Sequence, residues 1–126
     1  MDTAPRVLVT YSTAAGSTAG IAERVAQVLR DAGCAVRCLP ATADLDLAGV
    51  DGLVVGSAVH DMAWLAPSVE VLRRAAASGT PAVWCFSVGG VRPRGPVTRR
   101  LAALEARRGG ALFPAELRVR DHRVVG

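Results

Sequence analysis

Four aliphatic hydroxyls and a glycine lie within one short stretch, Tyr11-Ser12-Thr13-Ala14-Ala15-Gly16-Ser17-Thr18. An apolar, strand-like run precedes the stretch, and a helix-like run follows it. Such a turn can bind a phosphate group, because the amides of the first helical turn and the positive end of the helix dipole point at an anion. The alternative is an ordinary strand-to-helix turn with Ser and Thr caps. The predicted phosphate loop consists of Ser12, Thr13, Ala14, Ala15, Gly16, Ser17 and Thr18.

The chemistry of this loop disfavours two common nucleotide sites. The loop has no charged residue, and the whole chain has no lysine. A P-loop NTPase needs a lysine that reaches the β- and γ-phosphates. The G-x-G-x-x-G pattern of a dinucleotide fold is also absent from the loop. A single phosphate ester, held by hydroxyls and backbone amides, is the ligand that these residues predict.

Strand and helix signals alternate along the chain. Strands are predicted over Arg6–Tyr11, Ala35–Leu39, Gly52–Gly56, Pro81–Val88 and Ala111–Val119. Helices are predicted over Ser17–Ala32, from Pro67 to before Gly79, and from Pro96 to Gly109-Gly110. In the segment Asp44–Val50 the apolar residues match neither the helical nor the strand spacing. Alternation of this kind predicts an α/β fold with a parallel sheet and helices on both faces.

We expect residues 1–126 to form a single domain, since this length suffices for one hydrophobic core. After the last predicted strand only Arg120–Gly126 remain, a segment too short and polar to cover a sheet face. We therefore expect the final helix of a doubly wound sheet to be missing. Either a second copy of the chain covers that face, or the chain is a shortened form.

The cysteines and the N-terminus predict a cytoplasmic protein. The chain has 3 cysteines, an odd number that disfavours a disulfide framework. Cys34 and Cys38 bracket a predicted strand and would lie about 13 Å apart, beyond the reach of a disulfide. Cys85 lies in another predicted strand beside Trp84. We expect these residues to be buried, with the thiols reduced. No signal peptide or membrane span is visible.

Two further loops are expected at the edge where the predicted strands end. Ligands of open α/β sheets bind beyond the carboxyl ends of the strands. One loop follows the third strand, over residues 57–65, and the other follows the fourth, over residues 87–95. One loop for a phosphate and two for a flat, mostly apolar group is the layout expected for FMN. Loops without ligand contacts are the alternative.

The motifs resemble those of the flavodoxin family. The first loop is similar to the flavodoxin pattern [YF]-[SG]-[ST]-x-x-G-x-T, and Asp51–Val59 is similar to D-x-[LVI]-[VI]-[VI]-G-[ST]. The resemblance is closer to the flavodoxin-type, menaquinone-dependent protoporphyrinogen dehydrogenase, with G-A-S-I-R-Y matching Gly56–Asp61 and F-Y-S-V matching Cys85–Val88. It covers about residues 6–119 and implies a doubly wound, five-stranded parallel sheet of order 2-1-3-4-5.

By this resemblance the first loop would hold the FMN phosphate, and the other loops would edge the isoalloxazine ring. Trp64 has two open roles, stacking on the flavin or packing under the following helix. The predicted ring contacts are Ser57, Ala58, Val59, His60, Trp64, Ser87, Val88, Gly89 and Gly90. No metal-ligand cluster and no Ser/His/Asp arrangement stands out in the sequence.

An FMN-dependent oxidoreductase is the function that these features favour. Arg92 and Arg94 in the third loop would receive a quinone or an anionic small molecule. A one-electron carrier is the first alternative, although a chain with a pI near 9.8 would need an acidic partner protein. A flavin-free interaction module on the same fold is the second. Nucleic acid is not an expected partner.

Overall fold

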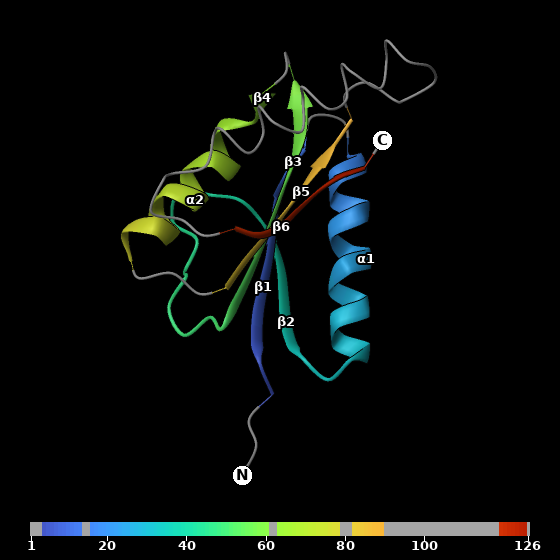
Figure 1. The fold of residues 1–126 in the computed structure, drawn as a ribbon, viewed down its shortest axis with the longest axis vertical. Helices are drawn as coiled ribbons and strands as arrows, with labels where there is room; N and C mark the ends of the chain where they lie inside the picture. The colour runs from blue at the N-terminus through green and yellow to red at the C-terminus, as the bar shows by residue number, and fades with distance from the viewer. Residues whose placement is uncertain (1–3, 14–15, 61–62, 79–81, 90–118, 126) are drawn as a thin grey trace.

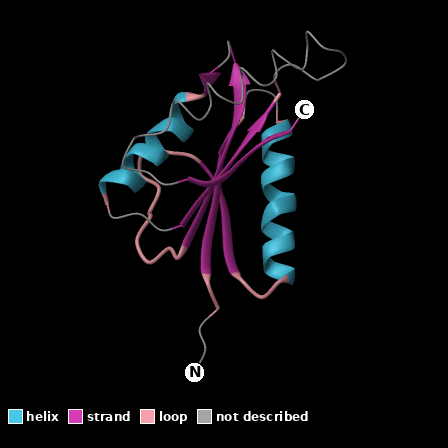
Figure 2. Ribbon diagram, viewed as in Figure 1, coloured by secondary structure: helices cyan, strands magenta, loops and turns pink. Residues whose placement is uncertain are grey.

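Six strands and two helices make up the described part of the chain (Figures 1 and 2). The structure is a computed structural model, and it describes residues 4–13, 16–60, 63–78, 82–89 and 119–125. The elements are β1 (Arg6–Ser12), α1 (Ser17–Asp31), β2 (Ala35–Pro40), β3 (Gly52–His60), β4 (Ala63–Trp64), α2 (Ala66–Ala77), β5 (Ala82–Val88) and β6 (Val119–Val125).

The sheet has the order β2-β1-β3-β5-β6, and these five strands run parallel. The short strand β4 pairs antiparallel with β3. Helix α1 covers one face of the sheet and α2 covers the other (Figure 1). The predicted doubly wound α/β fold and its strand order are confirmed, with β4 as an addition to the five predicted strands.

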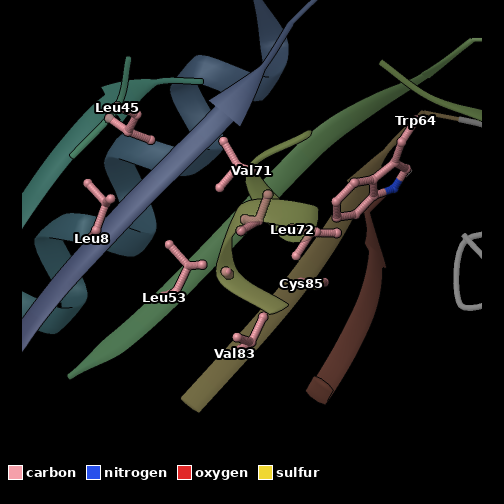
Figure 3. Packing of buried hydrophobic residues seen from close by; sticks show 10 residues of the cluster. Leu8, Leu45, Leu53, Trp64, Val71, Leu72, Val83 and Cys85 are labelled. Carbon is pink, nitrogen blue, oxygen red and sulfur yellow. The ribbon is translucent and has the colours of Figure 1, made fainter. Parts of the chain in front are cut away.

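Alternation along each strand builds a core on both faces of the sheet, because successive side chains point to opposite sides. Leu8, Leu53 and Val83 face α2 and pack with Val71 and Leu72 of that helix (Figure 3). On the α1 side, a second cluster contains Val9, Val54, Phe86, Ala22 and Ala26. The central strands are therefore buried on both faces, as their continuous apolar runs predict.

Both helices start and stop close to where their sequence signals lie. Helix α1 ends at Asp31, with Ala32 as its C-cap, and Gly33 follows with a φ of 99°. Only glycine adopts this left-handed conformation at little cost, so Gly33 ends the helix. Helix α2 has Pro67 in its first turn, where a missing backbone N–H costs nothing.

The expectation that the residues after Val119 form a tail is wrong. Residues 119–125 form the strand beside β5, so this segment is part of the sheet. Its four consecutive polar residues, from Arg120 to Arg123, do not resemble an apolar strand, and the sequence pattern therefore did not predict it. Of the predicted last strand, Ala111–Val119, only Val119 lies within the described residues. The predicted helix from Pro96 to Gly109-Gly110 lies outside the described residues.

Two predictions about burial are also wrong. Trp84 is 40% exposed on the α1 side of the sheet, where it lines an apolar cavity of about 480 Å³ with Val25, Leu29 and Phe86. Cys34 and Cys38 are half-buried, because they belong to or adjoin β2, an edge strand of the sheet. Cys85 is buried, as predicted. No helix in the described ranges is long and apolar enough to cross a membrane.

Candidate functional site

The carboxyl ends of β1, β3 and β5 lie at the same edge of the sheet (Figure 1). Helix α1 also begins at this edge, and the β3–β4 hairpin rises from it. The structure thus brings together the described parts of all three predicted loops. Ala14, Ala15, Gly90, Arg92 and Arg94 lie outside the described residues.

The start of α1 leaves backbone amides without a side-chain cap. Gly16 is the N-cap residue, and it has a φ of 92°, which a side chain at this position would strain. No side chain caps the helix, and its first turn has no acidic residue. The first-turn N–H groups and the helix dipole therefore favour an anion at this end of α1.

Thr13 closes the turn that leads into this helix. The backbone N–H of Gly16 donates a hydrogen bond to Thr13 Oγ1 over 2.7 Å. A hydroxyl that accepts one hydrogen bond keeps its own proton for donation. Thr13 and Ser17 are both exposed, so their hydroxyls are accessible to a ligand. Thr18, by contrast, is only 1% exposed and packs on the side of α1 that faces the sheet.

Ser12 points away from this turn, into the interior on the α2 side of the sheet. It is 8% exposed, and its Oγ lies 2.7 Å from Oγ of Ser68, a fully buried residue of α2. Ser68 Oγ in turn donates to the backbone oxygen of Gly56, over 2.8 Å. Position 12 follows Thr10 and Leu8 on one face of β1, and this alternation directs it at α2.

The segment expected as a loop after the third strand is a β-hairpin. Strand β3 continues through His60, and residues Val59 and His60 pair with Trp64 and Ala63. The backbone of Ser57 is inside the sheet, between Ser12 of β1 and Ser87 of β5. Ala58 and Val59 are half-buried. A loop interpretation was therefore wrong, since β-branched Val59 and the short Ala63–Trp64 run extend the strand pairing.

Of the two roles open for Trp64, the structure shows packing. The indole is 6% exposed and belongs to the core cluster under α2 (Figure 3). Its Nε1–H donates to Ser87 Oγ over 2.7 Å. A buried indole N–H needs such a partner, so Ser87 anchors the ring in the interior.

The third loop begins after β5, where Ser87 is buried and Val88 is half-buried. Gly89 follows with a φ of 96°, in the left-handed region. A Cβ at this glycine would meet only the backbone oxygen of Val59, at 3.9 Å. Val88 and Gly89 thus lie close to the β3–β4 hairpin.

The described parts of the site contain hydroxyls and amides and have little charge. Apart from His60, none of the residues in 12–13, 16–18, 57–60, 63–65 and 87–89 is ionisable. In the part of the chain that the structure describes, no group of three or more His, Cys, Asp or Glu side chains is arranged to hold a metal ion. The arrangement suits a phosphate monoester at α1 and an apolar, planar group beside the hairpin.

Ser68 is the residue of this edge that sequence reasoning missed. It follows Pro67 at the start of α2, where a serine passes as an ordinary helix-start residue. A signal was present, since three strand segments, Thr10-Tyr11-Ser12, Val55-Gly56-Ser57 and Cys85-Phe86-Ser87, each carry a serine close to the carboxyl end of the strand. A buried hydroxyl needs a partner, and Ser68 supplies it for Ser12.

A family model described as a flavodoxin domain matches residues 8–117 of the chain. No curated protein matches the sequence. A flavodoxin from the domain Archaea is similar in structure, with a TM-score of 0.65 and 18% identity over 96% of this chain and 83% of that one.

Two further solved structures have the same fold. One is a flavodoxin mutant from Fusobacterium nucleatum bound to flavin mononucleotide, with a TM-score of 0.57 and 15% identity over 96% of this chain and 68% of that one. The other is the rubredoxin oxygen:oxidoreductase of Desulfovibrio gigas, with a TM-score of 0.65 and 20% identity over 98% of this chain. This chain spans only 31% of that oxidoreductase.

Proposed function

Because this chain belongs to the flavodoxin domain family, we propose that it binds FMN and acts as a redox protein. The observation that carries the proposal is the uncapped start of α1 beside Thr13. A phosphate there meets a helix N-terminus, an accessible hydroxyl and no repelling carboxylate in the first turn. FMN, when bound, supplies one- or two-electron transfer, and the residues of the chain bind and orient it.

The predicted FMN contacts fall into two proposed groups. Thr13, Ser17 and the amides of residues 16–18 are the proposed phosphate ligands. The backbone around Val59–His60 and Val88–Gly89 is the proposed border of the ring. The side chains of Ser12, Ser57, Trp64 and Ser87 are buried and bonded within the protein, so we assign them to support of the site.

Within this function we propose an oxidoreductase of the kind that the flavodoxin-type protoporphyrinogen dehydrogenase represents. A quinone or an anionic substrate would approach the third loop, near Arg92 and Arg94. The pI of about 9.8 supports this reading over a carrier that docks on basic partners. We also propose that the chain forms a single domain and is located in the cytoplasm. A second copy of the chain would cover the α1 side of the sheet.

The test is a titration of purified protein with FMN, followed by its visible absorbance and by quenching of flavin fluorescence. Saturable binding with a stoichiometry of one supports the function. A protein that binds no FMN would contradict it and leave the interaction module as the alternative. Continuous reoxidation of the reduced protein by a quinone would favour the enzyme, whereas transfer that needs a partner protein would favour the carrier.

Thr13 gives this proposal a residue-level prediction. We expect Thr13→Ala to weaken FMN binding more than tenfold, because a hydrogen bond to a charged acceptor contributes about 1.5–3 kcal/mol. Riboflavin, which has no phosphate, should lose little affinity. Thr18→Ala keeps the backbone amide and removes a buried side chain, so it should lower stability more than it weakens FMN binding. Equal losses for FMN and riboflavin in Thr13→Ala would place the phosphate elsewhere.

A further inference from the structure

Three neighbouring strands carry a row of buried serines toward their carboxyl ends. Ser12 of β1 is in register with Ser57 of β3, and Ser57 is in register with Ser87 of β5. Residues in register on parallel strands point to the same face of the sheet. The three side chains are at most 8% exposed, and all lie on the α2 side. We name Ser12, Ser57 and Ser87 the serine row.

Each member of the serine row contacts the short segment between β4 and the first turn of α2. Ser12 contacts Ser68, the backbone N–H of Leu65 donates to Ser57 Oγ over 2.9 Å, and Trp64 Nε1 donates to Ser87. Five consecutive residues, 64–68, are thereby fastened across three strand ends. No apolar packing could define this position as closely, because each hydrogen bond fixes a distance and a direction.

Counting protons fixes the direction of the bond between Ser12 and Ser68. A serine hydroxyl has one proton to donate. Ser68 donates its proton to the Gly56 oxygen, which can only accept. The hydrogen bond between the two hydroxyls must therefore be donated by Ser12. Its proton is committed to the interior, so Ser12 cannot also donate to a phosphate.

We propose that Ser68 is a positioning residue of the cofactor site, acting through Ser12 on the phosphate loop. Ser12 is the last residue of β1, and Thr13 follows it directly. Through Ser12 the buried hydroxyl of Ser68 fixes the orientation in which the phosphate loop leaves the sheet. The hydroxyl of Ser68 also donates to the backbone oxygen of Gly56, and this bond fixes the first turn of α2 to β3, just before the hairpin. This inference rests on the proposed binding of FMN.

The experiment is a double-mutant cycle of Ser12→Ala, Ser68→Ala and the double variant, with FMN and riboflavin affinities measured for each protein. We expect each single variant to bind FMN about five- to tenfold more weakly, the loss typical of one hydrogen bond. The double variant should lose no more than Ser68→Ala alone, because Ser68→Ala already removes the contact that Ser12→Ala removes. The loss should be greater for FMN than for riboflavin.

Ser78→Ala is the matched control. Ser78 is an exposed serine at the other end of the same helix, where its hydroxyl bonds, within the described ranges, to backbone oxygens of Arg74 and Ala75. The Ser78→Ala variant should bind FMN with the affinity of the wild type. Circular dichroism and urea unfolding of the apoproteins report whether each variant is folded. Ser12→Ala keeps the bond from Ser68 to Gly56, so it tests the inference even if Ser68→Ala does not fold.

The outcomes separate this inference from the proposed function. Coupled losses that are greater for FMN than for riboflavin support it. Additive losses, equal losses for the two flavins, or Ser12→Ala binding like Ser78→Ala would overturn it while FMN binding by the wild type still stands. A wild-type protein that binds no FMN would overturn the function and this inference together.

Discussion

At the scale of single residues, close packing decides which side chains this fold tolerates. Gly56 shows this most directly, because the ring of Phe86 lies over its Cα in the neighbouring strand. Phe86 is 6% exposed and belongs to the core on the α1 side. A glycine inside a strand is unfavourable by itself, and the aromatic ring that covers it explains its presence here.

We predict that Gly56→Ala destabilises the protein by about 1–3 kcal/mol, the usual cost of overpacking a filled core. The added Cβ would overlap the Phe86 ring, which must then turn away. Urea unfolding measures the loss. Combining Gly56→Ala with Phe86→Leu should recover part of it, since the smaller side chain leaves room. A double variant less stable than Gly56→Ala alone would contradict the steric explanation.

At the scale of elements, α2 holds an irregular segment as well as the site. Arg74 Nη2 donates to the Leu45 oxygen over 2.6 Å, and Leu45 is 6% exposed in the core cluster. This contact fastens residues 41–51, which have neither helix nor strand structure, to α2. Asp44–Val50 has neither the helical nor the strand pattern of apolar residues, and a side chain of α2 holds this segment in place.

The prediction at this scale compares two neighbouring arginines. Arg74→Ala should destabilise the protein by about 1–3 kcal/mol, because it removes a hydrogen bond from a charged donor to a partly buried carbonyl. Arg73→Ala should change stability by under about 0.5 kcal/mol, since its pair with Glu70, at 3.7 Å, is exposed. Thermal unfolding of both variants provides the comparison. Equal effects would refute the assigned role of Arg74.

At the scale of the whole molecule, burial controls the chemistry of the thiols. Burial raises the pKa of Cys85 from 9.0 to about 12. Burial, and then the charge and hydrogen bond of Glu23, raise the pKa of Cys38 from 9.0 to about 11. The folded chain therefore keeps these protons at a pH where the unfolded chain has lost them. This stabilisation is complete below pH 9 and is lost as the pH rises toward 12.

We expect the free energy of unfolding to fall as the pH rises above 9.0, with each thiol that ionises only in the unfolded chain contributing up to about 1.4 kcal/mol per pH unit. Urea unfolding at several values between about pH 8 and about pH 11 measures the slope of the unfolding free energy against pH. Cys85→Ala should make the slope shallower. At pH near 8, a thiol reagent should modify Cys85 only after unfolding, and rapid modification of the folded protein would contradict its burial.

Much of the fold could be predicted from the sequence because its signals are local. The bounds of α1 follow from Gly16 and Gly33, and the apolar runs in β1, β3 and β5 predict strands buried on both faces. The phosphate loop was predicted from its hydroxyls and its place before a helix, and it stays a prediction. The strand over residues 119–125 was not predicted, because its polar residues resemble a tail.

Amino-acid order alone thus determined the fold class, the strand order implied by the family and the loop that faces the helix start. Only the tertiary structure decided which hydroxyls of the candidate site are exposed and which face the interior. Ser12 and Thr13 are chemically alike neighbours, yet Ser12 is bonded to Ser68 and Thr13 is exposed. Their difference depends on a partner 56 residues away, which no local pattern encodes.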